Sequence, residues 1–309
     1  MNERAPEISV ILPAYNSQAT IGLCLEALRQ QSFKDFEVIV VNSSQEPSTA
    51  EIVTQGFPEV VFHQAPERLL PHGAGNLALK SARGSYLVFS DPDAIPHSDW
   101  LEKLMAARRD SNVVIQGAMG LHQSSWLSQG IHLCKWHALL PGLPAHGLWL
   151  VATGNALYPR SIVEEVGPFD GDLFSGDALM SWRAAAAGAE LCFDPAPVVD
   201  QNHEGDLVSL ARERWSRGLE FGQVRIAKEK WSSTKTLVTL VLLPLVILKV
   251  LATTGIASAR AGWFGVYLVT FPVHFVGHVA WILGEGWAQL QRLLGINPPM
   301  AVTEAAARK

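Results

Sequence analysis

Two aspartates, Asp91 and Asp93, follow a short apolar run at residues 86–89 and are separated only by a proline. Carboxylates two positions apart on a turn can bind one hard divalent cation, and that cation can neutralise a diphosphate as it leaves. Asp and Pro are also ordinary turn residues, so the pair by itself is weak evidence for a metal site. The elements around it must decide between a cation site and a plain turn.

The first 120 residues alternate between strand-like and helix-like segments. Apolar runs predict strands at residues 8–12, 36–41, 60–63, 86–89 and 113–117, and helical patterns cover residues 19–31, 49–56, 75–82 and 98–109. This alternation implies right-handed crossovers and a mostly parallel sheet. Ligands bind beyond the carboxyl ends of such strands. These ends are residues 13–16, 42–44 and 90–93.

Composition excludes some classes of protein. The chain has 309 residues and a formal net charge of -5. Nucleic-acid binding needs a concentrated basic surface, so this balance argues against such a partner.

The cysteines, Cys24, Cys134 and Cys192, are far apart and odd in number, which argues against a disulfide scaffold and fits a reducing cytosolic setting. The N-terminus has no apolar run of the kind that a secretory signal peptide needs.

The C-terminal part is strongly apolar. Residues 237–251 and 263–283 form two hydrophobic stretches, and a basic, tryptophan-bearing helix is expected before them at 208–230. A membrane-spanning helix needs about 20 apolar residues. The second stretch reaches that length, whereas the first does so only if it is extended past Lys249 to about residue 256.

Three interpretations of these stretches stay open. They form a hairpin of two membrane spans, they lie in the membrane interface, or they are a buried helical pair of a soluble protein. A basic helix next to them suits an anionic membrane face. We therefore expect one domain over residues 1–230 and a hydrophobic, membrane-associated hairpin with a polar tail over residues 231–309. The middle segment 126–147 mixes His, Trp, Pro and Gly, and we expect a loop or mobile segment there.

Four segments together resemble the family 2 glycosyltransferases. They read ISVILPAYN, GAGNLALKSARGSYLVFSDPD, TGNALYPRSIVEEVGPFD and LFSGDALMSWRAAAAG, and the resemblance covers roughly residues 7–222. It implies an α/β fold of GT-A type, with a Rossmann-like, mostly parallel sheet followed here by C-terminal hydrophobic helices. It also implies a metal-dependent inverting transfer of a sugar from a UDP- or GDP-sugar to an acceptor hydroxyl, with Mn²⁺ or Mg²⁺ as cofactor.

The resemblance assigns chemistry to particular residues. Asp91 and Asp93 match the family's metal-binding DxD motif. Asp177 matches the aspartate that deprotonates the acceptor hydroxyl, although Gly176 replaces its usual acidic neighbour. His203 lies where such enzymes often place a metal- or phosphate-contacting histidine. The alternatives are a helix N-cap for Asp177 and a structural role for His203.

The same resemblance predicts residues on the donor side. Pro13, Ala14 and Tyr15 would line the base and ribose, and Asn42 would contact the base where relatives usually carry Asp. The Gly-rich turn at residues 72–76 opens a helix, and helix N-termini attract phosphate. Gly75 stands where the family more often has Arg, which removes a charged contact. Further nucleotide contacts are expected from Asn76 and Lys80.

Two segments are predicted on the acceptor and sugar side. The first comprises Thr153, Gly154 and Asn155. The second is Arg214-Trp215, which resembles a shortened form of the family's QxxRW motif. An Arg beside a Trp could hold a diphosphate and cover the acceptor site. The alternative is an interfacial helix with a snorkelling Arg and a Trp anchor.

Two other functions remain to be weighed. Another metal-dependent nucleotide enzyme would usually carry a Gly-rich basic loop after the first strand, but residues 13–20 read PAYNSQAT. A decayed binding or assembly protein is motivated by the changes at positions 42, 75 and 176. For the transferase, the hydrophobic end predicts a membrane-associated enzyme with a cytoplasmic catalytic domain. The predicted acceptor is then lipid-linked or a membrane-proximal glycan.

Overall fold

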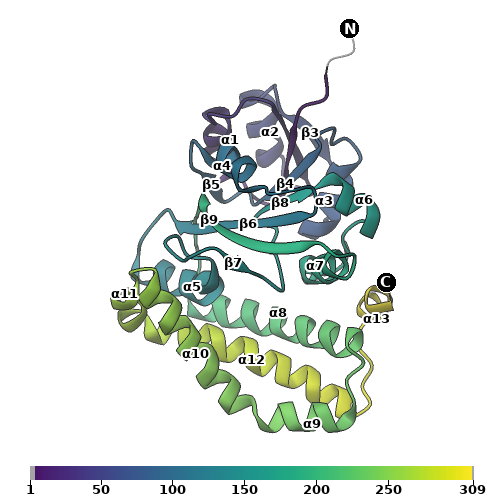
Figure 1. Ribbon diagram of the computed structural model, residues 1–309, viewed down its shortest axis with the longest axis vertical. Helices are drawn as coiled ribbons and strands as arrows, with labels where there is room; N and C mark the ends of the chain where they lie inside the picture. The colour runs from purple at the N-terminus through teal and green to yellow at the C-terminus, as the bar shows by residue number, and fades with distance from the viewer. Residues whose placement is uncertain (1–3, 308–309) are drawn as a thin grey trace. The chain divides into compact units, whose positions relative to one another are not determined.

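The computed structural model describes residues 4–307 and divides the chain into two compact units. The first, here called the sheet unit, comprises the chain up to His122 together with Pro144–Gln201. The second, the helical unit, comprises Gln123–Leu143 and the chain from Asn202 onward. Figure 1 labels most of the helices and strands of the two units.

The sheet unit contains all the strands that the structure describes. The strands are β1 (Ile8–Ala14), β2 (Phe36–Asn42), β3 (Val61–Gln64), β4 (Tyr86–Ser90), β5 (Ala94–Pro96), β6 (Val113–Leu121), β7 (His146–Gly147), β8 (Asn155–Pro159) and β9 (Glu190–Gln201). The helices are α1 (Ile21–Arg29), α2 (Ser48–Gly56), α3 (Pro71–Leu79), α4 (Trp100–Ala107), α6 (Arg160–Val166) and α7 (Gly176–Ala186). The predicted strands all exist, whereas β5, β7, β8 and β9 were not expected.

The sheet has the strand order β3-β2-β1-β4-β8-β6-β9-β5, and β7 pairs with β9. The first four strands of this order are parallel to one another, with Ile8 of β1 paired to Phe36 on one side and Tyr86 on the other. Beyond β4, antiparallel pairs enter the sheet at β4–β8 and β6–β8, while β6–β9 is parallel. The sheet is therefore mixed, and its N-terminal half is the parallel part that the sequence predicts.

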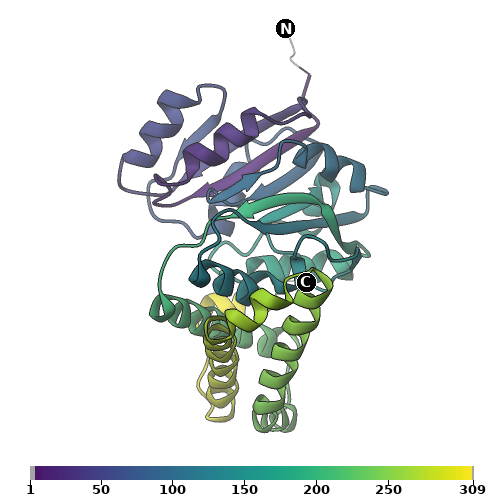
Figure 2. The same ribbon diagram turned by 90° about the vertical axis from the view of Figure 1, so that its left-hand side faces the viewer.

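The chain reverses its direction of travel across the sheet at β1. Strands β2 and β3 are added on one side of β1, and β4 then pairs on the other side. With right-handed crossovers, this reversal puts α1 and α2 on one face and α3 on the opposite face, as Figure 2 shows. The carboxyl ends of β1 and β4 lie side by side at this switch point, which is where open α/β sheets bind ligands.

The helical unit consists of α5 (Trp126–Trp136), a 3₁₀ turn at His137–Leu139, α8 (Leu207–Lys228), α9 (Ser233–Val241), α10 (Leu243–Arg260), α11 (Phe264–Val269), α12 (Phe271–Leu293) and α13 (Met300–Ala307). The loop expected at residues 126–147 is wrong over its first part, because α5 is helical there. Ser125 caps this helix by accepting a hydrogen bond from the backbone N of Ser128. The buried Ile131 and Cys134 lie on its inner side.

Both apolar stretches are interrupted. The first is divided at Leu242, and the second at Thr270, and each following helix carries a proline in its first turn, at Pro244 and Pro272. Among residues 4–307, one helix, α10, is long and apolar enough to cross a membrane. The second stretch is divided between α11 and the first half of α12, and neither of these helices meets the same measure of length and apolar character. Helix α13 covers most of the expected polar tail, and residues 308–309 lie outside the described part.

A buried ion pair connects two segments of the sheet unit. Nη1 of Arg183, on α7, lies 2.8 Å from Oδ2 of Asp170, and the side chains are 4% and 3% exposed. The Nη2 group of Arg183 also donates to the backbone oxygen of Pro168. Since Asp170 lies in the loop that leads into α7, the pair fixes that loop against the helix.

We expect Arg183→Met to lower the free energy of unfolding by about 3–5 kcal/mol, because it leaves the buried Asp170 carboxylate without its countercharge. Urea unfolding followed by circular dichroism measures the change. The matched control is Lys103→Met, which breaks an exposed pair with Asp99 and should cost less than about 1 kcal/mol. Equal losses in the two variants would contradict this account of the pair.

Candidate active site

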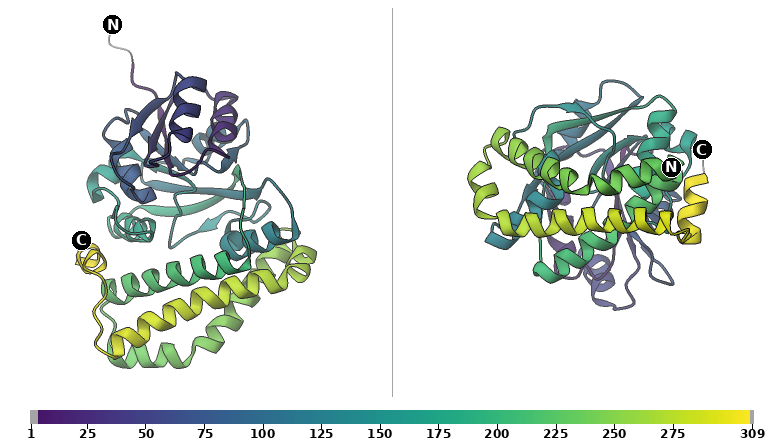
Figure 3. Two further views of the ribbon diagram at one scale, coloured as in Figure 1. Left: turned by 180° about the vertical axis from the view of Figure 1, so that it is seen from behind. Right: turned by 90° about the horizontal axis from the view of Figure 1, so that it is seen from below.

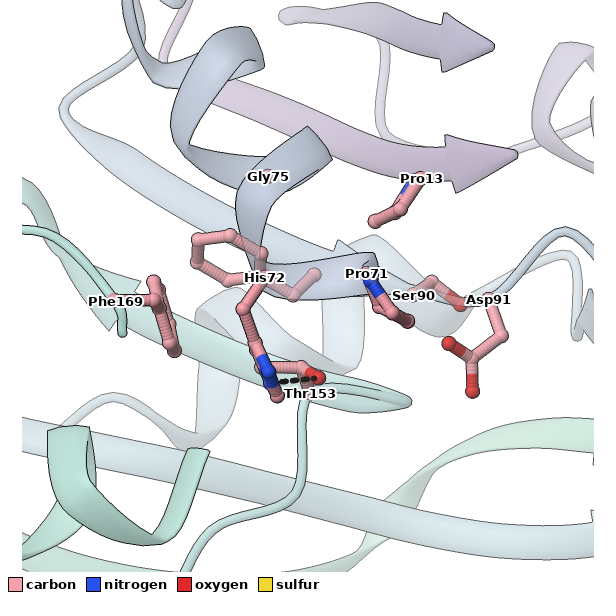
Figure 4. Close-up of a pocket in the computed structure, with 9 residues that line it drawn as sticks. Pro13, Pro71, His72, Gly75, Ser90, Asp91, Thr153 and Phe169 are labelled. Atoms are coloured by element: carbon pink, nitrogen blue, oxygen red, sulfur yellow. Dashed lines mark hydrogen bonds between the residues drawn. The ribbon is translucent and has the colours of Figure 1, made fainter. Parts of the chain in front are cut away.

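A small cavity of about 10 Å³, room for about one water molecule, lies at the switch point of the sheet unit. Figure 4 shows the side chains around it. They come from the ends of β1 and β4, the start of α3 and two later loops, and they are Pro13, Pro71, His72, Gly75, Phe89, Ser90, Asp91, Thr153 and Phe169. The cavity thus collects residues from four of the segments that the sequence singled out.

Asp91 and Asp93 both lie near one buried thiol. Burial raises the pKa of Cys24, and the negative charges of Asp93 and Asp91 raise it further. The Cys24 thiol donates a long hydrogen bond to the backbone oxygen of Asp91, at 3.7 Å. The two carboxylates of the predicted metal motif therefore share one neighbourhood at the end of β4, as the turn spacing predicts.

The Asp91 carboxylate depends on a glycine. A Cβ atom at position 154 would lie 2.9 Å from Oδ2 of Asp91. Any side chain there would displace the carboxylate that lines the cavity. Gly154, predicted on the sugar side, thus lies directly beside the predicted metal motif.

His72 occupies the centre of the site. Its ring stacks on Phe169, with ring centroids 5.3 Å apart. Its Nδ1 lies 3.0 Å from the backbone oxygen of Leu173, and because a carbonyl only accepts, Nδ1 carries the hydrogen. In the neutral ring Nε2 is then an acceptor, and it lies 3.4 Å from Oγ1 of Thr153, the contact drawn in Figure 4.

Position 176 explains how His72 fits. A Cβ atom at Gly176 would lie 2.8 Å from Nδ1 of His72 and 2.7 Å from the backbone oxygen of Asp170. The absence of the family's acidic residue at this position is therefore matched by the imidazole ring that fills the space. Gly176 begins α7, and Asp177 is the next residue of that helix.

Asp177 has a defined setting at the start of α7. One carboxylate oxygen accepts a hydrogen bond from the backbone N of Ala178 at 2.8 Å. The backbone oxygen of Asp177 accepts from the hydroxyl of Ser181, and Ser181 Oγ also accepts from the backbone N of Val151. These bonds tie α7 to the segment that carries Thr153. Burial raises the pKa of the nearby Tyr158, and the charge of Asp177 adds to this effect.

The site thus forms one continuous set of contacts. Asp91 lies against Gly154, Gly154 follows Thr153, Thr153 contacts His72, and His72 packs on Gly176. Asp177 comes next in the chain. The predicted cation site and the predicted base therefore belong to one local arrangement within the sheet unit.

The first strand supplies the predicted donor wall. Pro13 lines the cavity, and Ala14 is buried. Tyr15 is 42% exposed, and the guanidinium carbon of Arg68 lies 4.5 Å from its ring centroid. Arg68 is a cation that the sequence reasoning missed, because nothing in its local sequence links it to residue 15.

The side-chain amides of Asn42 and Asn76 form hydrogen bonds within the protein. Asn42 donates to Gln64 Oε1 and accepts from both the backbone N and the hydroxyl of Ser44. Asn76 donates to the backbone oxygen of Phe169 and accepts from its backbone N. A contact of either amide with a nucleotide would require these bonds to be exchanged, so both contacts stay predictions.

Lys80 lies far from the cavity within its own helix. It caps the C-terminal end of α3, whereas His72 lies in the first turn. At 1.5 Å per residue, eight residues separate the two Cα atoms by about 12 Å along the axis. The predicted contact of Lys80 with the nucleotide stays a prediction. It would require the long, exposed side chain to reach back toward the cavity.

Of the acceptor-side residues in the sheet unit, Thr153 faces the cavity and Asn155 does not. Asn155 is fully buried, accepts from Trp100 Nε1 at 2.8 Å and donates to the backbone oxygens of Ala118 and Pro197. It therefore cross-links β8 to its surroundings.

His203, Arg214 and Trp215 belong to the helical unit. Nε2 of His203 lies 3.0 Å from Nδ1 of His132, and burial, with smaller effects of His132 and Lys135, lowers the pKa of His203 to about 2. The guanidinium of Arg214 lies 4.2 Å from the ring centroid of Trp281, and Trp215 is 39% exposed. These contacts favour structural roles, and the predicted roles in binding stay predictions.

The donor set around Asp91 fits a hard divalent cation. In the part of the chain that the structure describes, no group of three or more His, Cys, Asp or Glu residues could hold a metal by itself. Mg²⁺ is commonly bound by one or two carboxylates together with substrate phosphates. Asp91 and Asp93, with Gly154 beside the Asp91 carboxylate, agree with that mode of binding.

Comparison with known proteins assigns this arrangement to a family. Residues 9–167 match the model of glycosyl transferase family 2. The glycosyltransferase AglE of Haloferax volcanii is 28% identical over 202 residues, which are 62% of this chain and 66% of that relative. The chain thus spans just under two thirds of that relative.

Two solved structures share the fold. A mannosyltransferase from Pyrobaculum calidifontis, in complex with GDP-Man and Mn²⁺, matches 98% of this chain and 79% of its own, with a TM-score of 0.51 and 18% identity. Residues 1–349 of S. aureus TarS, in complex with UDP-GlcNAc, match 94% of this chain and 92% of their own, with a TM-score of 0.52 and 19% identity. The α/β fold of GT-A type is confirmed.

We expect Asn155→Leu to lower the free energy of unfolding by at least about 2 kcal/mol, because it leaves the buried Trp100 N–H and two carbonyl oxygens without partners. Urea unfolding measures this loss. Asn112→Leu is the control, since Asn112 is exposed and donates one hydrogen bond, and it should cost less than about 1 kcal/mol. A stable Asn155→Leu protein would show that Asn155 has no structural role.

Proposed function

Because the chain belongs to glycosyl transferase family 2, we propose that it is a metal-dependent inverting glycosyltransferase. Its donor is a UDP- or GDP-sugar, and its acceptor is a hydroxyl of a lipid-linked or membrane-proximal glycan. The observation that carries this proposal is the continuous set of contacts from Asp91 through Thr153 and His72 to Gly176, the residue before Asp177. We assign the carboxylate pair Asp91 and Asp93 to the leaving diphosphate and the separate carboxylate of Asp177 to the acceptor.

On the donor side, Asp91 and Asp93 would hold the cation, whose charge would neutralise that of the leaving diphosphate. The aspartates lie at the switch point, next to Pro13 at the end of β1. The exposed Tyr15 and its partner Arg68 extend this wall outward. The neighbours in complex with GDP-Man and Mn²⁺ and with UDP-GlcNAc support a nucleotide-sugar donor of this general kind.

On the acceptor side, Asp177 acts as the general base. A single carboxylate that removes the proton from the attacking hydroxyl is what an inverting displacement requires, and such a group contributes about 10²- to 10⁴-fold to the rate. Its backbone and one carboxylate oxygen are fixed at the start of α7. A rigid helix positions such a group better than a loop would.

We expect one variant to lose nucleotide binding and a second variant to lose sugar transfer while it still binds the nucleotide. Asp93→Ala should lose the metal-dependent binding of UDP or GDP, whereas Asp177→Asn should bind within about twofold of the wild type and transfer about 10²- to 10⁴-fold more slowly. Calorimetry with and without Mn²⁺ or Mg²⁺ measures binding. Transfer is followed from the nucleotide-sugar to polyprenyl phosphate or glycolipid in vesicles. The exposed Asp110→Ala is the control and should match the wild type.

Two outcomes would contradict the proposal. A wild type that binds neither nucleotide with either metal would favour the decayed scaffold. Undiminished transfer by Asp177→Asn would remove this residue from the chemistry.

The burial pattern of the helical unit supports membrane association. Helix α9 exposes Leu237, Val238 and Val241 and buries Thr236, and α10 exposes Leu245, Leu248 and Ile256 while it buries Thr254, Gly255 and Ser258. Helix α12 buries His274, Gly277, His278, Gly284 and Gly286 and exposes Phe271, Phe275, Leu283 and Trp287. Figure 3 shows α10 and α12 side by side. Water favours the opposite pattern, whereas small and polar residues between helices, with large apolar ones outside, are typical of helices packed in lipid.

The cationic residues of α8 favour a cytoplasmic orientation. This helix and the two residues after it carry six cationic side chains, and α9 begins three residues later, at Ser233. The cations are Arg212, Arg214, Arg217, Arg225, Lys228 and Lys230. Lys and Arg next to apolar helices are attracted to the anionic cytoplasmic leaflet. We therefore propose that the catalytic domain lies on the cytoplasmic side and that the acceptor is presented at the membrane.

We expect the wild type to co-sediment with vesicles that contain anionic lipid, and Leu245→Glu with Leu248→Glu to reduce this partitioning at least about tenfold, because two carboxylates must then enter an apolar layer. The control is Leu23→Glu on α1 of the sheet unit, since Leu23 is as exposed as these leucines at 56%. Partitioning that is equal in all three proteins would overturn the membrane assignment.

A further inference from the structure

His72 has no role in the function proposed so far, although it lies between the two predicted chemical groups. It is 6% exposed and lines the cavity together with Asp91 and Thr153. Four separate contacts define its ring: Phe169 on one face, Leu173 at Nδ1, Thr153 at Nε2 and Gly176 against the Nδ1 edge. A side chain that only filled space would not need both nitrogens directed at polar partners.

The hydrogen-bond directions follow from the partners. The Leu173 carbonyl can only accept, so Nδ1 of His72 donates to it, and in the neutral ring Nε2 presents a lone pair. The Thr153 hydroxyl then donates to Nε2 of the neutral ring in this contact. Its oxygen then keeps its lone pairs for a group that approaches from the cavity, and such a group must be a hydrogen-bond donor.

The location of this acceptor identifies the chemical class of the group. Thr153 precedes Gly154, whose open face adjoins Oδ2 of Asp91. A diphosphate offers only acceptor oxygens, so it would gain nothing from the free lone pairs of Thr153. A sugar hydroxyl can donate to them, and in a nucleotide-sugar the sugar is attached directly to the diphosphate.

We propose that His72 is a positioning residue of the donor site, which orients the Thr153 hydroxyl so that its oxygen accepts a hydrogen bond from a hydroxyl of the donor sugar. This inference rests on the proposed function and deepens it, because it separates recognition of the sugar from recognition of the nucleotide. The nucleotide depends on Asp91, Asp93 and the end of β1, and the sugar depends on Thr153 as held by His72.

The two nitrogens of His72 can be tested separately. In His72→Asn the amide N–H can replace Nδ1 toward Leu173, but nothing replaces Nε2 toward Thr153. In His72→Gln the longer side chain can reach Thr153 with its amide oxygen. We expect His72→Asn to bind the sugar nucleotide roughly 3- to 10-fold more weakly, as expected for one lost hydrogen bond, and to bind the free nucleotide as the wild type does. His72→Gln should recover much of the loss.

Calorimetry with GDP against GDP-mannose, and UDP against UDP-GlcNAc, makes this comparison for whichever pair the wild type binds. Thr153→Val should give the same selective loss as His72→Asn, and the double variant should be no worse than either single one, because both remove one interaction. Thr153→Val also guards against a folding defect of the histidine variants. The control His146→Asn removes an exposed ring whose Nδ1 donates to the Pro144 carbonyl, and it should change neither affinity.

The outcomes are distinguishable. A wild type that binds no nucleotide overturns the proposed function and this inference with it. Nucleotide binding by the wild type, with equal losses of nucleotide and sugar nucleotide in His72→Asn, leaves the proposed function standing and overturns the role of His72 in sugar recognition. Additive effects of His72→Asn and Thr153→Val would also overturn it, because the histidine would then act independently of Thr153.

Discussion

The reversal of strand order at β1 is the constraint on which the sheet unit depends. Strands β2 and β3 extend the sheet on one side of β1, and β4 joins on the other, so the carboxyl ends of β1 and β4 lie side by side. The cavity lies outside these ends, where open α/β sheets bind ligands. Pro13 and Asp91 lie at its two sides. Helix α3 and the loops that contain Thr153 and Phe169 supply further side chains to this cavity.

The loops that complete the cavity are held by internal bonds. Asn76 clamps the backbone of Phe169 at two atoms, Arg183 holds Asp170, and Gln116 accepts from the backbone N of Ala152. Loops that carry binding groups gain accuracy when a rigid scaffold fixes them. Asn76, which was predicted to contact the nucleotide, thus fixes Phe169, a residue that lines the cavity.

The sequence predicted the elements whose signals lie in adjacent residues of the chain. The strands β1, β2 and β4 are short buried runs with turn residues at their ends, and these signals are local. The strands β8 and β9 were missed, because Asn155–Pro159 and Glu190–Gln201 become strands only by pairing across the sheet. Helix α5 was missed because its apolar face is interrupted by His and Trp. The position of His72 over Gly176 joins residues 104 apart in the sequence, and no local pattern contains it.

Packing also gives a different meaning to the residues that argued for decay. Gly176 stands where the family resemblance implies an acidic side chain, yet the space is occupied by His72. Gly73, the next residue of α3, lies so close to Gly171 that a Cβ at position 171 would lie 2.9 Å from the Cα of Gly73. Random loss of function would leave gaps where side chains had been. Here Gly176 and Gly171 are each matched by a neighbour that leaves no room for a Cβ atom, whereas a Cβ at Gly75 would make only ordinary contact with Phe89, at 3.6 Å. Compensating changes of this kind, in which one side chain is lost and a neighbouring side chain fills its space, argue for a retained site rather than for a decayed one.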